Sequence, residues 1–265
     1  MLRRVPFAGV LNFRDIGGYP VAGGGVTRRC VVYRSDSLHY LTGGDLAAFD
    51  ALGVKTVYDL RRPGEIARFP GPRECVQLEI PSGDLATWPA ESLQTRQDGE
   101  KWLQADYLSM ITGAAPAFGS LLARLADDRG LPAVVHCLGG KDRTGMAIAL
   151  LLTALGVDRV TVLDDYEMTS RCHAARVPEV VEAFTRRGIS RAAGEALMST
   201  PAGQWPRRCG NWIRHTAASA STCSAPAACH RRPSAHCAPT SSARTTWSAT
   251  ACPQAIPRRT LSSAS

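Results

Sequence analysis

Short apolar segments rich in β-branched residues alternate with longer amphipathic segments along residues 30–190. The short segments predict buried strands at residues 30–33, 54–60, 76–80 and 132–137. The longer segments predict helices that begin near Thr42, Pro63, Glu100, Ala117, Arg143, Asp158 and Pro178. Strands that alternate with helices indicate an α/β domain with a central, mostly parallel sheet flanked by helices.

Charge divides the chain into two unequal parts. All 23 acidic residues and 23 of the 31 basic residues lie in residues 1–203, and the remaining eight are arginines after Gln204. The body therefore carries no net charge, which argues against nucleic acid as a partner, because such binding depends on a basic face.

No segment has the pattern of a membrane span or a signal peptide. Residues 1–10 contain two arginines but lack the apolar run of a signal peptide. The longest apolar stretch, residues 146–155, is too short to cross a bilayer. We therefore expect a cytoplasmic protein without a transmembrane segment, although secretion without a signal peptide is compatible with the sequence.

The candidate chemistry lies between the fourth predicted strand and the helix that follows it. Residues 136–145 read His-Cys-Leu-Gly-Gly-Lys-Asp-Arg-Thr-Gly. Ligands of parallel sheets bind beyond the carboxyl ends of the strands, and this strand delivers Cys137 to that edge. A plain strand–turn–helix connection is the alternative, which the close spacing of these residue types disfavours.

Each residue type in this loop suits phosphoryl transfer. A cysteine attacks as its thiolate, which a helix N-terminus and a nearby guanidinium both favour. Gly139 and Gly140 allow the backbone to curl so that successive N–H groups surround an anion. Arg143 can grip two phosphate oxygens and stabilise the transition state. Thr144 can hydrogen-bond the sulfur, and His136 can orient the loop.

The loop resembles the signature of bacterial tyrosine phosphatases, which are related in loop chemistry to dual-specificity and phosphoinositide phosphatases. A second segment, Asn-Phe-Arg-Asp-Ile-Gly-Gly-Tyr at residues 12–19, is similar to the N-terminal motif of that family. Asp59–Leu60–Arg61 and Asp165–Tyr166 also match family positions. The resemblance covers about residues 7–190 and implies a cysteine-phosphatase fold.

The resemblance implies specific roles for the loop residues. Cys137 becomes the nucleophile and Arg143 the phosphate clamp, and no metal or cofactor is required. Asp142 can position water or share in proton transfer, or it can simply cap the helix. The basic Lys141 resembles loops of phosphoinositide phosphatases. The expected phosphate-binding residues are Leu138, Gly139, Gly140, Lys141, Asp142, Arg143 and Thr144.

The general acid is less clear from the sequence. The Trp-Pro-Asp loop of larger tyrosine phosphatases is absent, since Trp88 and Pro89 are followed by Ala90. Asp84 follows the third predicted strand and resembles the candidate acid of the family. A turn-forming role for Asp84 is the alternative.

Other charged residues of the motifs are expected to support the site. Arg14 and Asp15 are flanked by Phe13 and Ile16, which favours a buried Arg14–Asp15 ion pair bracing the floor of the site over direct substrate contact. Arg61 and Asp165 are expected to be structural. Residues 82–111 form either a mobile lid over the site or an amphipathic helix packed permanently on the sheet.

The C-terminal part has the composition of a disordered segment. After Gln204 the chain has no Asp, Glu, Lys or Val and a single leucine, so it cannot bury a core. Shifting the reading frame turns Asn211–Trp212 into Leu, and lets residues 216–223 encode Gly-Ser-Val-Gly-Val-Tyr-Leu, which is similar to the C-terminal part of the family. We therefore expect a phosphatase domain over residues 1–200 and a disordered, frameshifted tail over 201–265.

The predicted function is a protein-tyrosine phosphatase that acts through a phosphocysteine, with phosphotyrosine proteins as substrates. A dual-specificity or phosphoinositide phosphatase is the alternative within the class. A sulfurtransferase also places a cysteine on an anion loop, but Arg143 and the resemblance disfavour it. The alternative from another class is a non-catalytic phosphate-binding module.

Overall fold

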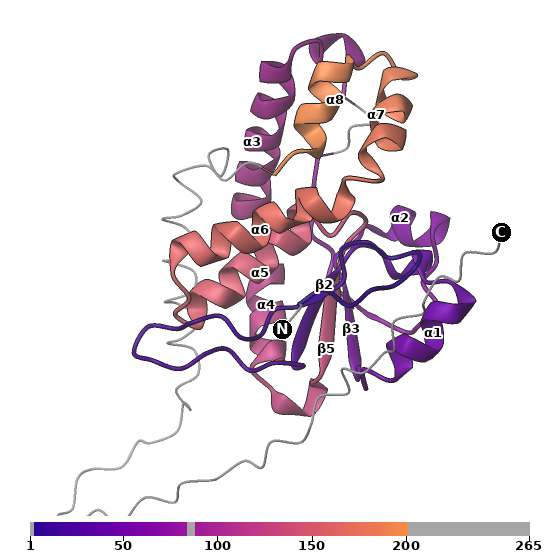
Figure 1. Cartoon of the computed structure of the whole chain (residues 1–265). Helices are drawn as coiled ribbons and strands as arrows, with labels where there is room; N and C mark the ends of the chain where they lie inside the picture. Colours follow the sequence, from indigo (N-terminus) through magenta and orange to yellow (C-terminus); the bar gives the residue numbers. More distant parts are fainter. Residues whose placement is uncertain (1–2, 84–87, 201–265) are drawn as a thin grey trace, which may run out of the picture.

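The structure is a computed structural model that describes residues 3–83 and 88–200 (Figure 1). The predicted acid Asp84 lies outside the described residues, and so does the predicted tail with its altered reading frame. The domain limits therefore stay predictions.

A five-stranded sheet forms the centre of the described part (Figure 1). Its strands are β1 (Arg14–Asp15), β2 (Val32–Ser35), β3 (Thr56–Asp59), β4 (Val76–Gln77) and β5 (Ala133–His136). The order is β1-β2-β5-β3-β4, and only β1 runs antiparallel to its neighbour. The predicted α/β fold with a mostly parallel sheet is confirmed. Because β5 lies in the middle, its carboxyl end delivers Cys137 to the centre of the sheet edge.

The alternation of side chains along β5 explains why its sequence is apolar up to His136. Val134 packs in one cluster with Phe13 and Phe49, whereas Ala133 and Val135 belong to a second cluster on the other face. Successive side chains of a strand point to opposite faces, so a strand covered on both faces reads as a continuous apolar run. Burial of both faces fixes the register of β5 and hence the position of Cys137.

Helices cover both faces and one end of the sheet (Figure 1). They are α1 (Gly43–Asp50), α2 (Pro63–Arg68), α3 (Arg96–Gly113), α4 (Ala115–Leu125), α5 (Asp142–Ala154), α6 (Arg159–His173), α7 (Val177–Thr185) and α8 (Arg191–Met198), with short 3-10 turns at Leu38–Tyr40, Ala90–Ser92 and Asp128–Gly130. Helices α4, α5 and α6 lie on one side of the sheet and α1 on the other. Helices α3, α7 and α8 stand together beyond one end of the sheet, next to the site.

Helix α3 begins earlier than the sequence suggested, within the segment expected to be a loop. Thr95 caps it, because its Oγ1 accepts from the N–H of Asp98 at 3.2 Å while the Asp98 carboxylate accepts from the N–H of Thr95 at 2.8 Å. Trp102, Tyr107 and Met110 are at most 8 % exposed and join the core. This burial favours the packed helix over the mobile lid for α3.

Helix α8 was not predicted. Its buried residues are Ala193, Gly194, Ala196 and Leu197, three of which are small. Small residues allow close packing: a Cβ at Gly99 of α3 would lie 2.7 Å from the carbonyl oxygen of Ala193. The contact therefore requires glycine at position 99.

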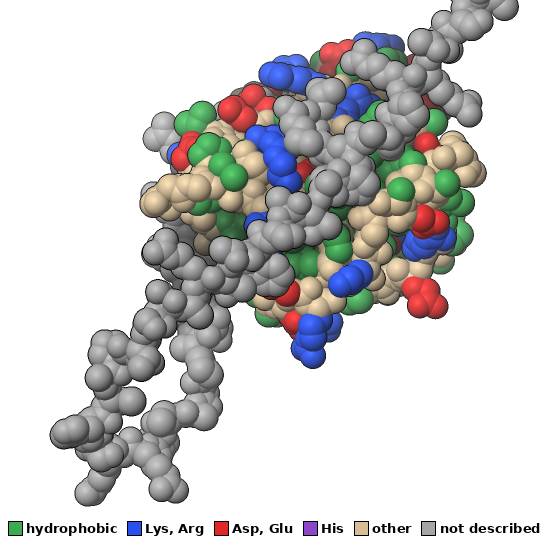
Figure 2. Space-filling view, turned by 60° about the horizontal axis from the view of Figure 1, so that its bottom comes forward, with side chains coloured by type: hydrophobic (Ala, Val, Ile, Leu, Met, Phe, Trp, Pro, Cys, Tyr) green, Lys and Arg blue, Asp and Glu red, His purple; other side chains and the backbone are tan. Residues whose placement is uncertain are grey.

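Charged side chains of both signs are interspersed over the visible described surface in Figure 2. Within residues 3–83 and 88–200, no single helix is long and apolar enough to cross a bilayer, although α3 and α4, bent by 69° where they meet, would qualify together by length and composition. In the same ranges, no cluster of His, Cys, Asp or Glu could hold a metal ion.

Candidate active site

The loop between β5 and α5 is held by contacts that turn its carbonyl groups outward. The carbonyl oxygen of Leu138 accepts from the backbone N–H of Ser37 at 2.9 Å. The carbonyl of Gly139 accepts from His173 Nε2 at 2.6 Å, and that of Gly140 from Arg34 at 2.7 Å. Asn12 Nδ2 also donates to the carbonyl oxygen of Gly140, at 3.1 Å. Three successive carbonyl groups are therefore fixed by groups outside the loop.

The orientation of these carbonyls determines where the loop N–H groups point. In a planar trans peptide the C=O and N–H bonds point in opposite directions. The N–H groups of Gly139, Gly140 and Lys141 must therefore point away from the residues that hold the carbonyls. No backbone acceptor pairs with these N–H groups in the part of the chain that the structure describes. A set of neighbouring N–H groups without backbone partners can bind an anion.

Gly140 is required by the backbone of this loop. Its φ is +62°, and a Cβ there would lie 2.3 Å from the carbonyl oxygen of Ser35. Side chains other than hydrogen strongly disfavour this backbone conformation and would also clash. Gly140 therefore allows the loop to approach β2 closely.

Cys137 and Arg143 are both largely buried, at 2 % and 7 % exposed. Burial opposes the charge on Arg143, but the hydrogen bonds to Glu65 raise the pKa of the guanidinium, and electrostatic interaction with Cys137 adds to this effect. The guanidinium is thus close enough to the sulfur to interact with it electrostatically. The arrangement places a cation beside the predicted nucleophile.

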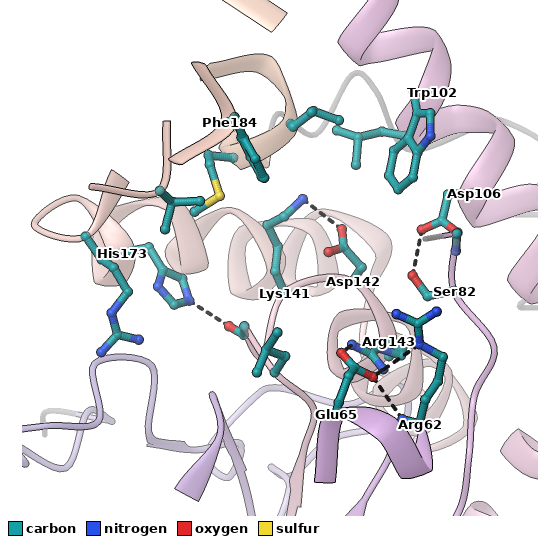
Figure 3. A pocket seen from close by; sticks show the side chains of 18 of the residues that line it. Arg62, Glu65, Ser82, Trp102, Asp106, Lys141, Asp142, Arg143, His173 and Phe184 are labelled. Carbon is teal, nitrogen blue, oxygen red and sulfur yellow. Dashed lines mark hydrogen bonds and ion pairs between the residues drawn. The ribbon is translucent and has the colours of Figure 1, made fainter. Parts of the chain in front are cut away.

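Glu65 of α2 fixes the Arg143 side chain and was missed by sequence reasoning. Its two carboxylate oxygens accept from the two terminal nitrogens of Arg143 at 2.6 and 2.8 Å (Figure 3). Burial alone would raise the pKa of Glu65, but the hydrogen bonds and charge of Arg143 outweigh burial and lower it to about 2. A bidentate pair of this kind restricts the guanidinium plane. Glu65 therefore presets Arg143 for an incoming oxyanion.

We expect Glu65→Gln to lower kcat/KM for an aryl phosphate by on the order of 10- to 100-fold, because a misoriented Arg143 no longer grips the transferred group. Steady-state kinetics would measure this loss. Glu74→Gln is the matched control, since Glu74 is exposed and outside the pocket. Equal activities of the two variants would show that Arg143 does not depend on Glu65.

Lys141 and Asp142 lie at the start of α5 and contact each other. The Lys141 ammonium donates to Asp142 Oδ1 at 2.7 Å, and the hydroxyl of Tyr107 donates to the same oxygen at 2.5 Å. Tyr107 in turn contacts the hydroxyl of Tyr166. Both residues of the pair line the pocket.

His136 and Thr144 differ in how well they fit their expected contacts. His136 is buried, with Nδ1 at 3.2 Å from the carbonyl oxygen of Cys137 and Nε2 at 3.7 Å from Asp59. Burial lowers the pKa of His136, which favours a neutral ring. The Thr144 hydroxyl is buried without a hydrogen-bond partner among the described residues, so the expected bond to the sulfur is not formed in this structure.

The expected ion pair between Arg14 and Asp15 is wrong. Neighbouring residues of a strand point to opposite faces, and these two form β1. Arg14 instead pairs with Asp165 of α6 at 3.1 Å. Asp15 accepts from the backbone N–H groups of Gly17 and Cys30 at 2.8 and 3.1 Å. Asp15 therefore stabilises a turn rather than the floor of the site.

Asp165 is the centre of a buried charge network behind the loop. It accepts from Arg14 and, at 2.5 Å, from Arg34, and both guanidinium groups are fully buried. Tyr19 also donates to it, at 2.8 Å. Burial disfavours the charged form of Asp165, yet the two arginines hold its pKa well below the ordinary value. Because Arg34 also bonds the Gly140 carbonyl, this network connects α6 to the loop.

The loop opens into a cavity of about 350 Å³ bounded by α2, α3, α6, α7 and α8 (Figure 3). Its apolar wall includes Trp102, Leu103, Val180, Phe184 and Leu197. Cationic side chains that line the same cavity are Arg62, Lys141, Arg143 and Arg176. An apolar wall facing an anion-binding loop suits an aryl group that carries a phosphate.

The comparisons with known proteins agree with this geometry. The model of the tyrosine phosphatase family matches residues 5–222. A protein of Cupriavidus necator that carries a provisional tyrosine-protein phosphatase name is 30 % identical over 198 residues, covering 71 % of this chain and 68 % of its relative.

A second curated relative is the triple specificity protein phosphatase PtpB of Mycobacterium tuberculosis, 28 % identical, with 76 % of this chain and 81 % of the relative covered. Among solved structures, that of TpbA from P. aeruginosa matches at 18 % identity with a TM-score of 0.34, covering 71 % of this chain and 87 % of the other. The extent of the family match shows that this chain belongs to the tyrosine phosphatase family.

Proposed function

We propose that this tyrosine phosphatase hydrolyses the phosphate ester of phosphotyrosine in proteins, through a covalent phosphocysteine on Cys137. The observation that supports this most strongly is the set of three loop carbonyls fixed outward, which leaves the N–H groups of Gly139, Gly140 and Lys141 for the equatorial oxygens of a phosphate.

The proposed reaction has two steps. The Cys137 thiolate attacks phosphorus and displaces the alkoxide or phenoxide, while Arg143 and the loop N–H groups bind the phosphate oxygens. A carboxylic acid supplies a proton to the leaving oxygen, and Asp84 stays the candidate from the sequence. Water then attacks the phosphocysteine, and in this proposal Asp142 orients that water.

Phosphotyrosine is favoured over phosphoserine because the apolar wall of Trp102, Leu103 and Phe184 can pack against an aromatic ring. Phosphoinositides are the second candidate substrate, supported by the cationic side chains of Arg62, Lys141 and Arg176 around the same cavity. A cytoplasmic location also stays a prediction, which fractionation of the producing cells would test.

Rates on matched substrates test the proposal. We expect kcat/KM for a phosphotyrosine peptide to exceed that for the same peptide with phosphoserine by about 10-fold or more, because only the tyrosyl ring fills the apolar side of the cavity. The assay measures phosphate release, with a soluble phosphoinositide as a third substrate.

Trp102→Ala should reduce the preference for phosphotyrosine more than it reduces the phosphoserine rate. A faster reaction on the phosphoinositide would instead assign the cavity to inositol headgroups. Release of no phosphate from any of the three would contradict the catalytic proposal.

A further inference from the structure

A buried carboxyl group other than the predicted acids faces the pocket. Asp106 of α3 lines the same cavity as Lys141, Asp142 and Arg143 (Figure 3), and it is 6 % exposed. It lies on the opposite side of α3 from solvent, one turn after Trp102. The sequence analysis did not select this residue, because it belongs to no motif.

The hydrogen bonds of Asp106 are compatible with both its protonated and its ionised form. Its Oδ2 accepts from the hydroxyl of Ser82 at 3.0 Å, and its Oδ1 accepts from the backbone N–H of Gly83. A protonated Oδ2 can keep its partner, since the serine hydroxyl can accept a hydrogen bond as well as donate one. The Gly83 N–H can still bond the other oxygen.

Burial favours the protonated form of Asp106. Burial is the largest cause that raises the pKa of Asp106, and the negative charge of Asp142 adds to it. The hydrogen bonds from Gly83 and Ser82 and the positive charge of Arg143 act in the opposite direction, and the pKa remains raised. A raised pKa is a property that a general acid needs near neutral pH.

Asp142 has different surroundings. Its Oδ1 accepts from the Lys141 ammonium and from the Tyr107 hydroxyl. Lys141 can only donate, so this Asp142 oxygen acts as an acceptor, whereas Asp106 is held by the neutral Ser82 hydroxyl and Gly83 N–H. Two carboxyl groups in one pocket with different hydrogen-bond partners can take separate acid and base roles.

We propose that Asp106 is the proton donor to the leaving group, a role that rests on the proposed phosphatase function. In the first step the S–P bond forms, the ester P–O bond breaks, and the proton on Asp106 Oδ2 moves to the departing oxygen. In the second step water attacks phosphorus, the S–P bond breaks, and the proton of the water returns to Asp106. Asp142 orients the water.

Leaving groups of different acidity test this assignment. A phenol needs protonation as it leaves, whereas 4-nitrophenol leaves as a stable anion. We expect Asp106→Asn to lower kcat for phenyl phosphate and phosphotyrosine peptide by about 100-fold or more, and to lower kcat for 4-nitrophenyl phosphate by less than about 10-fold. Glu100→Gln, a change on the same helix outside the pocket, is the control.

Three further variants make the outcome decisive. Asp84→Asn and Asp142→Asn are measured on the same substrates, and Cys137→Ser checks that hydrolysis depends on the proposed nucleophile. A selective loss in Asp106→Asn alone supports the assignment. An equal loss of Asp106→Asn on all substrates indicates a structural role and overturns it, as does a selective loss confined to Asp84→Asn or Asp142→Asn. Activity that survives in Cys137→Ser would instead contradict the proposed function itself.

Discussion

Replacement of Cys137 by serine should abolish hydrolysis of aryl phosphates, by at least about 10⁴-fold in kcat, while phosphate and vanadate still bind. A serine hydroxyl remains protonated at neutral pH and is a poor nucleophile without a base. The groups proposed to bind the anion are separate from the sulfur: they are Arg143 and the loop N–H groups, whose carbonyl partners are held by Arg34, Asn12 and His173. The Cys137→Ser variant should therefore lose turnover and keep anion binding.

Phosphate release and calorimetric binding of vanadate would measure the two properties on one preparation. Cys75→Ser is the matched control, because Cys75 is an exposed free thiol outside the cavity. Loss of turnover in the Cys75 variant, or its survival in the Cys137 variant, would contradict the assignment of the nucleophile.

The second large effect concerns stability. Asp165→Asn should destabilise the folded protein by about 3–5 kcal/mol, because it leaves Arg14 and Arg34 buried without a counter-charge. Urea unfolding would measure this loss. Asp164→Asn is the control, since Asp164 is the exposed neighbour on the same helix. Equal stabilities of the two variants would show that the buried network does not support the fold.

The same network gives a dependence on pH. Arg14 and Arg34 overcome the effect of burial and lower the pKa of folded Asp165 below the ordinary aspartate value of about 3.9. The group therefore binds more protons when unfolded. Its stabilising contribution is complete above about pH 5 and is lost as the pH falls through the unfolded pKa toward the folded pKa. The Asn variant should lack this part of the acid sensitivity.

Some of the site could be predicted from sequence because its residues are contiguous. The loop 136–145 contains its nucleophile, its glycines and its cation within ten positions, so strand, turn and helix signals placed them together. Gly140 was predicted to let the loop backbone curl, and its positive φ is needed for the close approach to β2.

The supporting residues could not be found in this way because the fold brings them from distant segments. Glu65, Arg34 and His173 act on the loop from α2, β2 and α6, and no spacing rule connects these positions. Asp15 shows the opposite error, because adjacency in sequence suggested a partner for Arg14 that strand geometry forbids. In each case the partner of the side chain is set by contacts between elements that are distant in the sequence, and not by local pattern.

We expect Cys137 to carry the phosphoryl group during turnover, with the loop N–H groups and Arg143 binding the phosphoryl oxygens. Rapid acid quenching of the enzyme during hydrolysis of phosphotyrosine peptide, followed by peptide mass spectrometry, tests it directly. We predict a single phosphoryl group on the peptide that contains Cys137, and none in Cys137→Ser. A phosphoryl group on another residue, or continued turnover with no phosphorylated enzyme at any quench time, would contradict it.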